Sequence, residues 1–356
     1  MNQSIRRWQG TDNHGLWPAL LAVDPGAVDL GDLPDLFELA NRLVDILGPS
    51  LAGHVLSGTS GTAASPLVDA GEVQHDRLLN RFRRVDGLRW ARLAAEHGIP
   101  VVCLKGLAIA HFVYAEPDLR TMADADLLVR LADRDDLLAV FDAAGLRFRT
   151  PEARSPWGFI SDASYQPLTT DDHQSNVDLH VHPDAWPLHR ALPTSEVFAA
   201  ARPLASPSGD ILAPSTTHML LLCASHAARD LFGPTTVKSL IDAALLLHLK
   251  AGEIDWGELQ ALASAARVGK PVRAFFAILD RLGGPTAALP AGLGQAPASA
   301  EFERAMADYL ALFPDDAGIL GKLRREALLC AEPQVALRRN LQRLWGLFRP
   351  NLGLPD

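Results

Sequence analysis

The stretch that decides the fold is IPVVCLKG, residues 99–106, an apolar and β-branched run that ends abruptly in a lysine and a glycine. The run predicts a short buried strand, and residues 107–114 after it predict a helix. At such a junction Gly106 lets the backbone approach a ligand closely, and the free N–H groups of the first helical turn can bind phosphate. Lys105 beside it can neutralise phosphate charge. The junction therefore predicts a phosphate-binding turn.

A second strand is predicted over residues 123–130 and carries Asp124 and Asp126. Residues two apart in a strand point to the same face, so both carboxylates lie together beside a core. Two adjacent carboxylates repel one another, and a divalent ion such as Mg²⁺ resolves that conflict by binding between them. Arg120, just before the strand, could make a planar bidentate contact with a phosphate. A pair of exposed aspartates is the commoner arrangement for this spacing, but the preceding turn favours a nucleoside triphosphate site.

A third carboxylate lies in the stretch NVDLHVH, residues 176–182. Its alternation places Asp178, His180 and His182 on one face and the apolar residues on the other. Two-metal phosphoryl transfer needs such a set, in which a carboxylate pair holds both ions and a third completes the site of one of them. His180 could orient Asp178 or contact a phosphate. The same pattern also fits an ordinary half-buried strand, and a zinc site of these three side chains is a weaker alternative.

The remaining pattern divides the chain into three regions. Residues 1–74 are predicted to be an N-terminal helical segment and a linker, residues 75–205 a nucleotide-binding α+β domain, and residues 206–356 a helical domain. The linker prediction rests on the Gly- and Ser-rich stretch 49–74. Further elements are predicted as helices over 34–48, 74–97, 133–145, 215–232, 235–250, 255–267 and 270–283, two or three helices across 299–348, and strands over 159–168 and 176–182.

Composition limits the classes of function. The chain has 356 residues, 48% of them hydrophobic and 21% charged, which is typical of a globular protein. Cys103, Cys223 and Cys330 lie far apart in apolar runs, which indicates buried thiols in a reducing compartment. No apolar run is long enough to span a membrane, and residues 1–10 lack the pattern of a signal peptide, so we expect a cytoplasmic protein.

Charge is unevenly placed along the chain. The formal net charge of -9 disfavours a general nucleic-acid binder. Residues 321–349 are basic and could receive an anionic partner, although a solvated helix face is the commoner explanation. Seven basic side chains stand there against Glu326 and Glu332; they are Lys322, Arg324, Arg325, Arg338, Arg339, Arg343 and Arg349. In the helical domain, His226 and Asp242 could point into a cleft between domains, or could be satisfied polar residues at a helix contact.

In this order, Leu104-Lys105-Gly106, Arg120, Asp124-x-Asp126 and Val177-Asp178-Leu179-His180 resemble the uncharacterised bacterial nucleotidyltransferase family within the polymerase-beta-like nucleotidyltransferase superfamily. The similarity covers about residues 75–270 and includes Ser225-His226, the stretch from Lys238 to Asp242, and Ile254-Asp255-Trp256. The resemblance implies a small mixed sheet flanked by helices, followed by a mainly helical domain. It also implies that Asp124 and Asp126 are the paired metal-binding aspartates and Asp178 is the third carboxylate. A Lys-Gly turn stands where the superfamily usually has Gly-Ser.

Together, the motifs and the resemblance predict an enzyme that depends on Mg²⁺ or Mn²⁺. A nucleoside triphosphate such as ATP would lie against Lys105, Gly106 and Arg120, with a contact from His180. Its nucleotidyl group would pass to an acceptor hydroxyl with release of pyrophosphate, while Asp178 helps to deprotonate that hydroxyl.

The acceptor is open among a peptide, a protein, an RNA and a small molecule, and the resemblance allows a peptide-tailoring role. Two alternatives stay open. One is a non-catalytic nucleotide- or partner-binding module that kept the fold. The other is a transferase that uses another activated phosphate donor, such as a nucleotide sugar. No oligomeric state is predicted.

Overall fold

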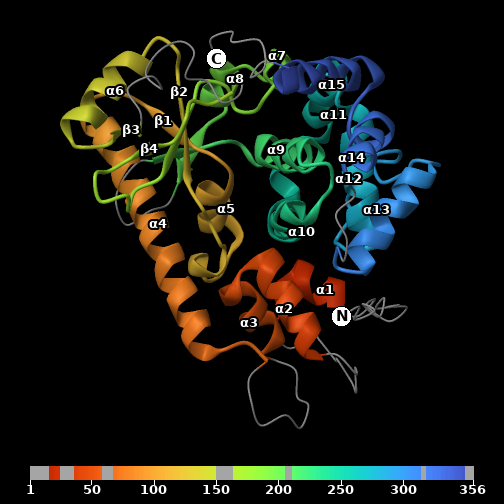
Figure 1. Cartoon of the computed structure of the whole chain (residues 1–356). Coiled ribbons are helices and arrows are strands. Elements are labelled where there is room, and N and C mark those ends of the chain that lie inside the picture. The colour runs from red at the N-terminus through yellow and green to blue at the C-terminus, as the bar shows by residue number, and fades with distance from the viewer. Residues whose placement is uncertain are drawn as a thin grey trace.

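The computed structural model places a mixed β-sheet beside a largely helical region, which confirms the predicted α+β class (Figure 1). The sheet and α1–α4 occupy one side and the bottom of the view, and α9–α15 occupy the other side. Buried apolar side chains from both parts form one continuous cluster. The structure describes residues 16–24, 36–57, 67–149, 163–204, 211–313 and 318–348, with side chains described up to residue 341.

The sheet has seven strands in the order β3-β4-β5-β2-β1-β7-β6. β1 pairs antiparallel with β2, whereas β2 pairs parallel with β5 and β1 pairs parallel with β7. The motif-bearing strands β2, β1 and β5 are therefore the central strands of the sheet. The strands are β1 (Val101–Cys103), β2 (Ala125–Val129), β3 (Arg147–Phe148), β4 (Leu168–Thr169), β5 (Val177–His180), β6 (Arg202–Leu204) and β7 (Ile211–Ala213).

The short outer strands are the part of the sheet that the sequence did not predict. β3, β6 and β7 span two or three residues, too few for an alternating pattern to be visible. β7 lies beyond residue 205, where the helical domain is predicted to begin, and it hydrogen-bonds to β1. Residues 159–162 of the predicted strand 159–168 lie outside the described residues. Among residues 163–168, β4 begins at Leu168, and Ser164 forms an isolated bridge with His180.

Helix α4 (Ala70–Glu96) runs along one face of the sheet, as Figure 1 shows, and contacts β1, β2 and β7. It begins at Asp69, whose side chain accepts the N–H of Glu72 at 2.9 Å, and it ends before Gly98, whose φ of 73° breaks the helix. Trp90 of α4 packs edge-on against Phe141 of α6 (Arg134–Ala143), with 5.5 Å between ring centroids. The other helices around the sheet are α5 (Lys105–Val113), α7 (Leu188–Ala191) and α8 (Thr194–Ala199).

The prediction of a loop over residues 49–74 is wrong at both ends. Helix α2 (Leu36–Leu47) is followed at once by α3 (Pro49–Leu56), and α4 begins at Ala70. The Gly48-Pro49 pair ends one helix and starts the next, because glycine accepts the φ of 89° in the turn and proline fits the first turn of a helix. Residues 58–66 of the predicted linker lie outside the described residues. Helix α1 spans Leu16–Ala22.

The region after β7 is helical, as predicted, and the first four predicted helices end within a few residues of the observed ones. α9 and α10 pack on each other and on α5, so they face the sheet side that α4 does not cover. The helices are α9 (Thr216–Arg229), α10 (Val237–Lys250), α11 (Trp256–Ala265), α12 (Gly269–Arg281), α13 (Ala300–Leu310), α14 (Gly318–Arg325) and α15 (Pro333–Phe348). Among the described residues, no helix is long and apolar enough to cross a membrane.

The basic C-terminal helices pack on their own chain. Arg324 and Arg325 form ion pairs with Glu301, which is 1% exposed. Arg338 lies over the ring of Trp186 at 4.2 Å, and Arg339 donates to the carbonyl oxygen of the same residue at 2.9 Å. Arg324 and Arg325 therefore join helices within the helical region, whereas Arg338 and Arg339 join α15 to the segment before α7. The side chains of Arg343 and Arg349 lie outside the described residues. The three cysteines are buried free thiols, as predicted.

Candidate functional site

Three carboxylates come together where β2 and β5 run side by side. In the parallel register of these strands Asp126 pairs with Asp178, and Asp124 stands immediately before β2. Burial and the charges of Asp124 and Asp126 raise the pKa of Asp178 to about 7. Burial and the charge of Asp126 also raise the pKa of Asp124. The structure therefore places Asp126 and Asp178 together with Asp124 near them, and the three disfavour one another's charge. Asp124 is not among the described residues whose ligand atoms gather within 4.8 Å, so its role as a metal ligand stays a prediction.

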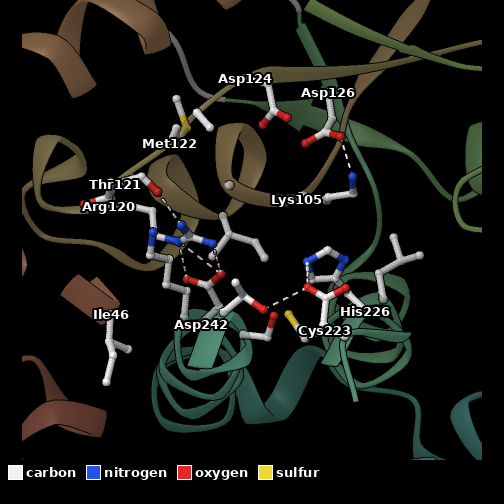
Figure 2. A pocket seen from close by; sticks show the side chains of 18 of the residues that line it. Ile46, Lys105, Arg120, Thr121, Met122, Asp124, Asp126, Cys223, His226 and Asp242 are labelled. Carbon is white, nitrogen blue, oxygen red and sulfur yellow. Dashed lines mark hydrogen bonds and ion pairs between the residues drawn. The ribbon is translucent and has the colours of Figure 1, made fainter. Parts of the chain in front are cut away.

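Lys105 supplies the positive charge closest to this cluster. Its Nζ forms an ion pair with Asp126 Oδ1, and Figure 2 shows the side chain reaching toward that carboxylate. Burial acts to raise the pKa of Asp126, but Lys105 and His180 hold it well below its usual range. Lys105 is the first residue of α5 and has a φ of 45°, which costs a non-glycine residue about 1–3 kcal/mol and is typical of functional sites.

His180 lies behind Asp126 and is 2% exposed. Its Nε2 is 2.8 Å from Asp126 Oδ1. Because burial lowers the pKa of His180, we assign the imidazole as neutral with Nε2–H donating to Asp126. The sequence predicted a contact with Asp178 or with a phosphate, and the structure gives the contact to Asp126 instead. Holding a metal-binding carboxylate in place is a common role for such a histidine.

The donor atoms fit a divalent metal ion. Among the residues that the structure describes, Asp126, Asp178 and His180 each offer a ligand atom within 4.8 Å of the others. Asp178 Oδ1 is buried and has no hydrogen-bond partner among them. A buried carboxylate oxygen without a partner is costly, and a cation beside it removes that cost. Within the described part of the chain, His182 does not belong to this set of ligand atoms, and its ring stacks on that of His189.

Arg120 has a different partner from the one predicted. Its Nε is 2.9 Å from Asp242 Oδ1 and its Nη2 is 2.8 Å from Asp242 Oδ2, so the planar fork already holds a carboxylate. Asp242 is 2% exposed and also accepts the hydroxyl of Tyr114 at 2.8 Å. Asp242 is therefore a satisfied polar residue at a helix contact, and Arg120 ties the loop before β2 to α10. The predicted contact of Arg120 with phosphate stays a prediction.

A cavity of about 380 Å³ lies between the carboxylate end of β2 and the helices α9 and α10, as Figure 2 shows. The predicted residues that line it are Lys105, Gly106, Arg120, Asp124 and Asp126, whereas Asp178 and His180 do not. A side chain at Gly106 would crowd this wall, because a Cβ there would lie 3.3 Å from Met122 Cγ. The predicted phosphate turn therefore faces an open space large enough for a small molecule.

Sequence reasoning missed several residues of the cavity. Asp45 and Ile46 of α2 line it, although they precede the motifs by many residues. Lys238 of α10 lines it as well, one helical turn before Asp242. Nothing in the local pattern marks these residues, because tertiary packing alone brings α2 and α10 to β2. In the sequence, the stretch from Lys238 to Asp242 was marked by its similarity to the family, and only Asp242 was considered as a possible cleft residue.

His226 lines the same cavity from α9. Arg229 Nη2 is 2.6 Å from His226 Nδ1, and His226 Nε2 is 3.5 Å from Asp230 Oδ2. Since a guanidinium only donates, Nδ1 accepts and the ring proton is on Nε2, facing Asp230. Both ring nitrogens are thus engaged, and His226 is a fixed polar wall residue rather than a free base.

Comparison with protein-family models gives one result. A family described as an uncharacterised nucleotidyltransferase matches residues 76–284, which is more than half of the chain. That range runs from α4 to the end of α12 and contains every residue of the predicted site. Comparison with curated proteins and with solved structures gives no match. Helices α1–α3, which contribute Asp45 and Ile46 to the cavity, lie outside the matched range.

Proposed function

The chain belongs to the uncharacterised nucleotidyltransferase family, and on this premise we propose that it is an enzyme dependent on Mg²⁺ or Mn²⁺. It transfers a nucleotidyl group from a nucleoside triphosphate to an acceptor hydroxyl and releases pyrophosphate. The observation that carries the proposal is the buried Oδ1 of Asp178, which has no hydrogen-bond partner among the described residues and stands beside Asp126, a residue that lines the same cavity as the Gly106 turn. Such an arrangement can bind a cation and offers a place for phosphates.

Asp124, Asp126 and Asp178 would hold the metal. When bound, the ion would supply positive charge against the phosphates and against the charge that develops during transfer. Oxygen donors suit Mg²⁺ and Mn²⁺. His180 keeps Asp126 oriented from behind, through the 2.8 Å contact.

The protein side chains have distinct tasks in the reaction. The acceptor oxygen attacks the α-phosphorus, the new P–O bond forms, and the bond from that phosphorus to the bridging oxygen breaks, so pyrophosphate leaves with the electron pair. Asp178 helps to deprotonate the hydroxyl, and its position beside Asp126 in the register of β2 and β5 supports this role. Lys105 contacts Asp126 and also lines the cavity, so one ammonium group can orient the carboxylate and meet a phosphate oxygen.

The wider assignment is also part of the proposal. A place in the polymerase-beta-like superfamily is supported by the mixed sheet and by the three carboxylates on and beside β2 and β5, whereas a bacterial origin rests on the resemblance alone. We keep ATP as the first nucleotide to test and a hydroxyl-bearing peptide as the first acceptor. Protein, RNA and small-molecule acceptors follow in the same assay.

The test uses nucleoside triphosphates labelled at the α-phosphate, with Mg²⁺ and a panel of hydroxyl acceptors. The full-length protein should release pyrophosphate and label one class of acceptor. Asp124→Asn and Asp126→Asn should each reduce transfer by about 100-fold or more, since each removes charge from the metal set. Asp136→Asn, an exposed change on α6 outside the cavity, is the matched control and should keep full activity.

Three outcomes separate the alternatives. Undiminished transfer in both site variants would contradict the mechanism. Nucleotide binding without pyrophosphate release would favour a non-catalytic module. Labelling from a nucleotide sugar but from no triphosphate would favour a transferase with another donor.

A further inference from the structure

The cavity is lined by three cationic side chains, and they differ in their partners. Lys105 is paired with Asp126, and Arg120 is paired with Asp242. Lys238 has neither a hydrogen bond nor an ion pair within the parts of the chain that the structure describes. Lys238 is therefore the cation of this cavity that is available for a ligand.

The position of Lys238 on α10 is fixed by its neighbours. Lys238 precedes Asp242 by four residues, so both side chains lie on the same face of α10, which is the face toward the cavity. Asp242 is held by Arg120 and Tyr114. This clamp keeps α10, and with it Lys238, at a set distance from the loop before β2.

Lys238 also stands near the phosphate turn. A Cβ at Gly106 would lie 3.7 Å from Arg120 Cζ, so the turn is packed against that guanidinium. Among the charged groups around Lys238, Arg120 has the largest electrostatic effect on it. Asp242, Asp76 and Arg83 follow. The Gly106 turn and Lys238 thus both lie near Arg120, and all three line the cavity.

An unpaired ammonium group in this place is costly. Burial, followed by repulsion from Arg120, lowers the pKa of Lys238 to about 8, and Asp242 offsets this only in part. A cation removed from water without a counterion destabilises the structure, and an anionic ligand would reverse that effect. The structure therefore leaves a local excess of positive charge on the α10 wall.

We infer that Lys238 binds the terminal phosphates of the nucleoside triphosphate, the ones that leave as pyrophosphate. This inference rests on the proposed function and assigns the recognition of the phosphate tail to the helical region rather than to Arg120. Arg120 instead holds the loop before β2 to α10 through its ion pair with Asp242. Lys238 gives the site its selectivity for triphosphates over monophosphates, because only the longer tail reaches α10.

The test measures binding alone, by calorimetry with Mg²⁺ and two probes: the α,β-methylene analogue of ATP, which cannot transfer its nucleotidyl group, and AMP. Lys238→Met should weaken binding of the triphosphate analogue by about 10-fold or more, the loss expected for a charge-assisted hydrogen bond. Binding of AMP should change less than 2-fold. Lys238→Arg should restore most of the triphosphate affinity.

Lys250→Met is the matched control. Lys250 is the last residue of α10, pairs with Glu253 at 3.1 Å and does not line the cavity, so both affinities should stay unchanged. Thermal unfolding separates a binding role from a structural one. Lys238→Met removes a poorly solvated charge and should keep or raise the melting temperature.

Failure of this inference and failure of the proposed function are distinguishable. If the wild-type protein binds the triphosphate analogue and Lys238→Met binds it equally well, Lys238 has no role in phosphate recognition and the proposed function stands. An equal loss for the analogue and AMP would also overturn the inference, since Lys238 would then not select the tail. Absence of any nucleotide binding and of pyrophosphate release in the wild-type protein would contradict the proposed function itself.

Discussion

The two walls of the cavity hold their charges in opposite ways. On the sheet wall, Asp124 and Asp126 line the cavity, Asp178 lies beside Asp126, and Lys105 is the adjacent cation. On the α10 wall, Asp242 is saturated by Arg120 and Tyr114, and the side chain of Lys238 has no counterion among the residues that the structure describes. The sheet wall therefore has an excess of negative charge and the α10 wall an excess of positive charge. The complex of a divalent ion with a polyphosphate that we propose would neutralise both.

The largest expected effect comes from removing the charge of Asp242. This change would break the ion pair with Arg120 that joins the loop before β2 to α10. Asp242→Asn leaves the guanidinium of Arg120, which is 11% exposed, without its carboxylate. Removing one partner of a buried pair typically costs 3–5 kcal/mol, so we expect a loss of about that size in the free energy of unfolding in urea.

Glu303→Gln is the control for Asp242→Asn. Glu303 pairs with Arg281 at 3.2 Å, and both side chains are about half exposed, so its loss should cost less than about 1 kcal/mol. If both variants lost the same small amount of unfolding free energy, the ion pair between Arg120 and Asp242 would not stabilise the fold as a buried pair should.

The second prediction concerns the crowding on the sheet wall. The pKa of Asp178 is raised to about 7, whereas an unfolded aspartate titrates near 4, so the folded state binds more protons between these values. Stability of the metal-free protein should therefore fall as pH rises from about 4 to about 7. Asp178→Asn should flatten this part of the profile and should be more stable than the wild type at pH 8, by on the order of 2 kcal/mol.

Thermal melts of both proteins at pH 5 and pH 8, in the presence of a chelator, measure the effect of Asp178. Mg²⁺ or Mn²⁺ at pH 8 should raise the melting temperature of the wild type and should raise that of Asp178→Asn less. If, at pH 8 and without metal, the wild type were more stable than Asp178→Asn, the prediction that the charge of Asp178 destabilises the metal-free protein would be wrong.

The third prediction concerns Gly48, which packs against Thr121 in the loop before β2. Gly48 has a φ of 89°, and a Cβ there would lie 2.5 Å from Thr121 Oγ1, which donates to Leu47 O at 2.7 Å. Gly48→Ala should therefore destabilise the protein by about 1–2 kcal/mol. Because Thr121 follows Arg120, it should also weaken nucleotide binding.

Gly252→Ala is the matched change for Gly48→Ala. Gly252 has no neighbour within 4 Å of an added Cβ and does not require a positive φ, so the free energy of unfolding should stay within about 0.5 kcal/mol of the wild type. A stable Gly48→Ala protein would show that the α2–α3 corner is not constrained by the loop.

The smallest expected effect is a pH dependence of binding on the α10 wall. With a pKa of about 8, Lys238 loses its charge as pH rises through that value, while Arg120 and Arg83 stay charged. Affinity for the triphosphate analogue should fall several-fold between pH 7.5 and 9, and Lys238→Met should show no such fall. Calorimetry at the two pH values measures it, and parallel curves for both proteins would assign the dependence to another group.

The strand motifs were readable from the sequence because their chemistry is local. The alternation that places Asp124 and Asp126 on one face depends on the strand period alone. Asp178 joins them because β5 pairs with β2 in a register that sets Asp178 against Asp126. The junction at Lys105 and Gly106 was visible for the same reason. The partner of Arg120 was not, because Asp242 lies far along the chain and only the packing of α10 on α5 brings it near.

The missed elements have equally physical reasons. β6 and β7 are three residues long each, and the pairing of β7 with β1 and of β6 with β7 decides their conformation rather than their own propensity. Pro49 ends the apolar period of α2, so the sequence pattern indicated a loop where α3 begins. In the sequence, Lys238 is a polar residue at an ordinary position of a helical pattern. It is distinguished only in the structure, where its side chain has no counterion among the described residues.

The most direct test of the two-wall account is calorimetry of the non-transferable triphosphate analogue with and without Mg²⁺, on the wild type, Asp124→Asn and Lys238→Met. We expect binding by the wild type that requires Mg²⁺, a strong loss of the Mg²⁺ effect in Asp124→Asn, and a weakened but still Mg²⁺-dependent binding in Lys238→Met. Binding that is equal with and without the ion, and unchanged in both variants, would contradict the claim that these walls hold one metal–nucleotide complex.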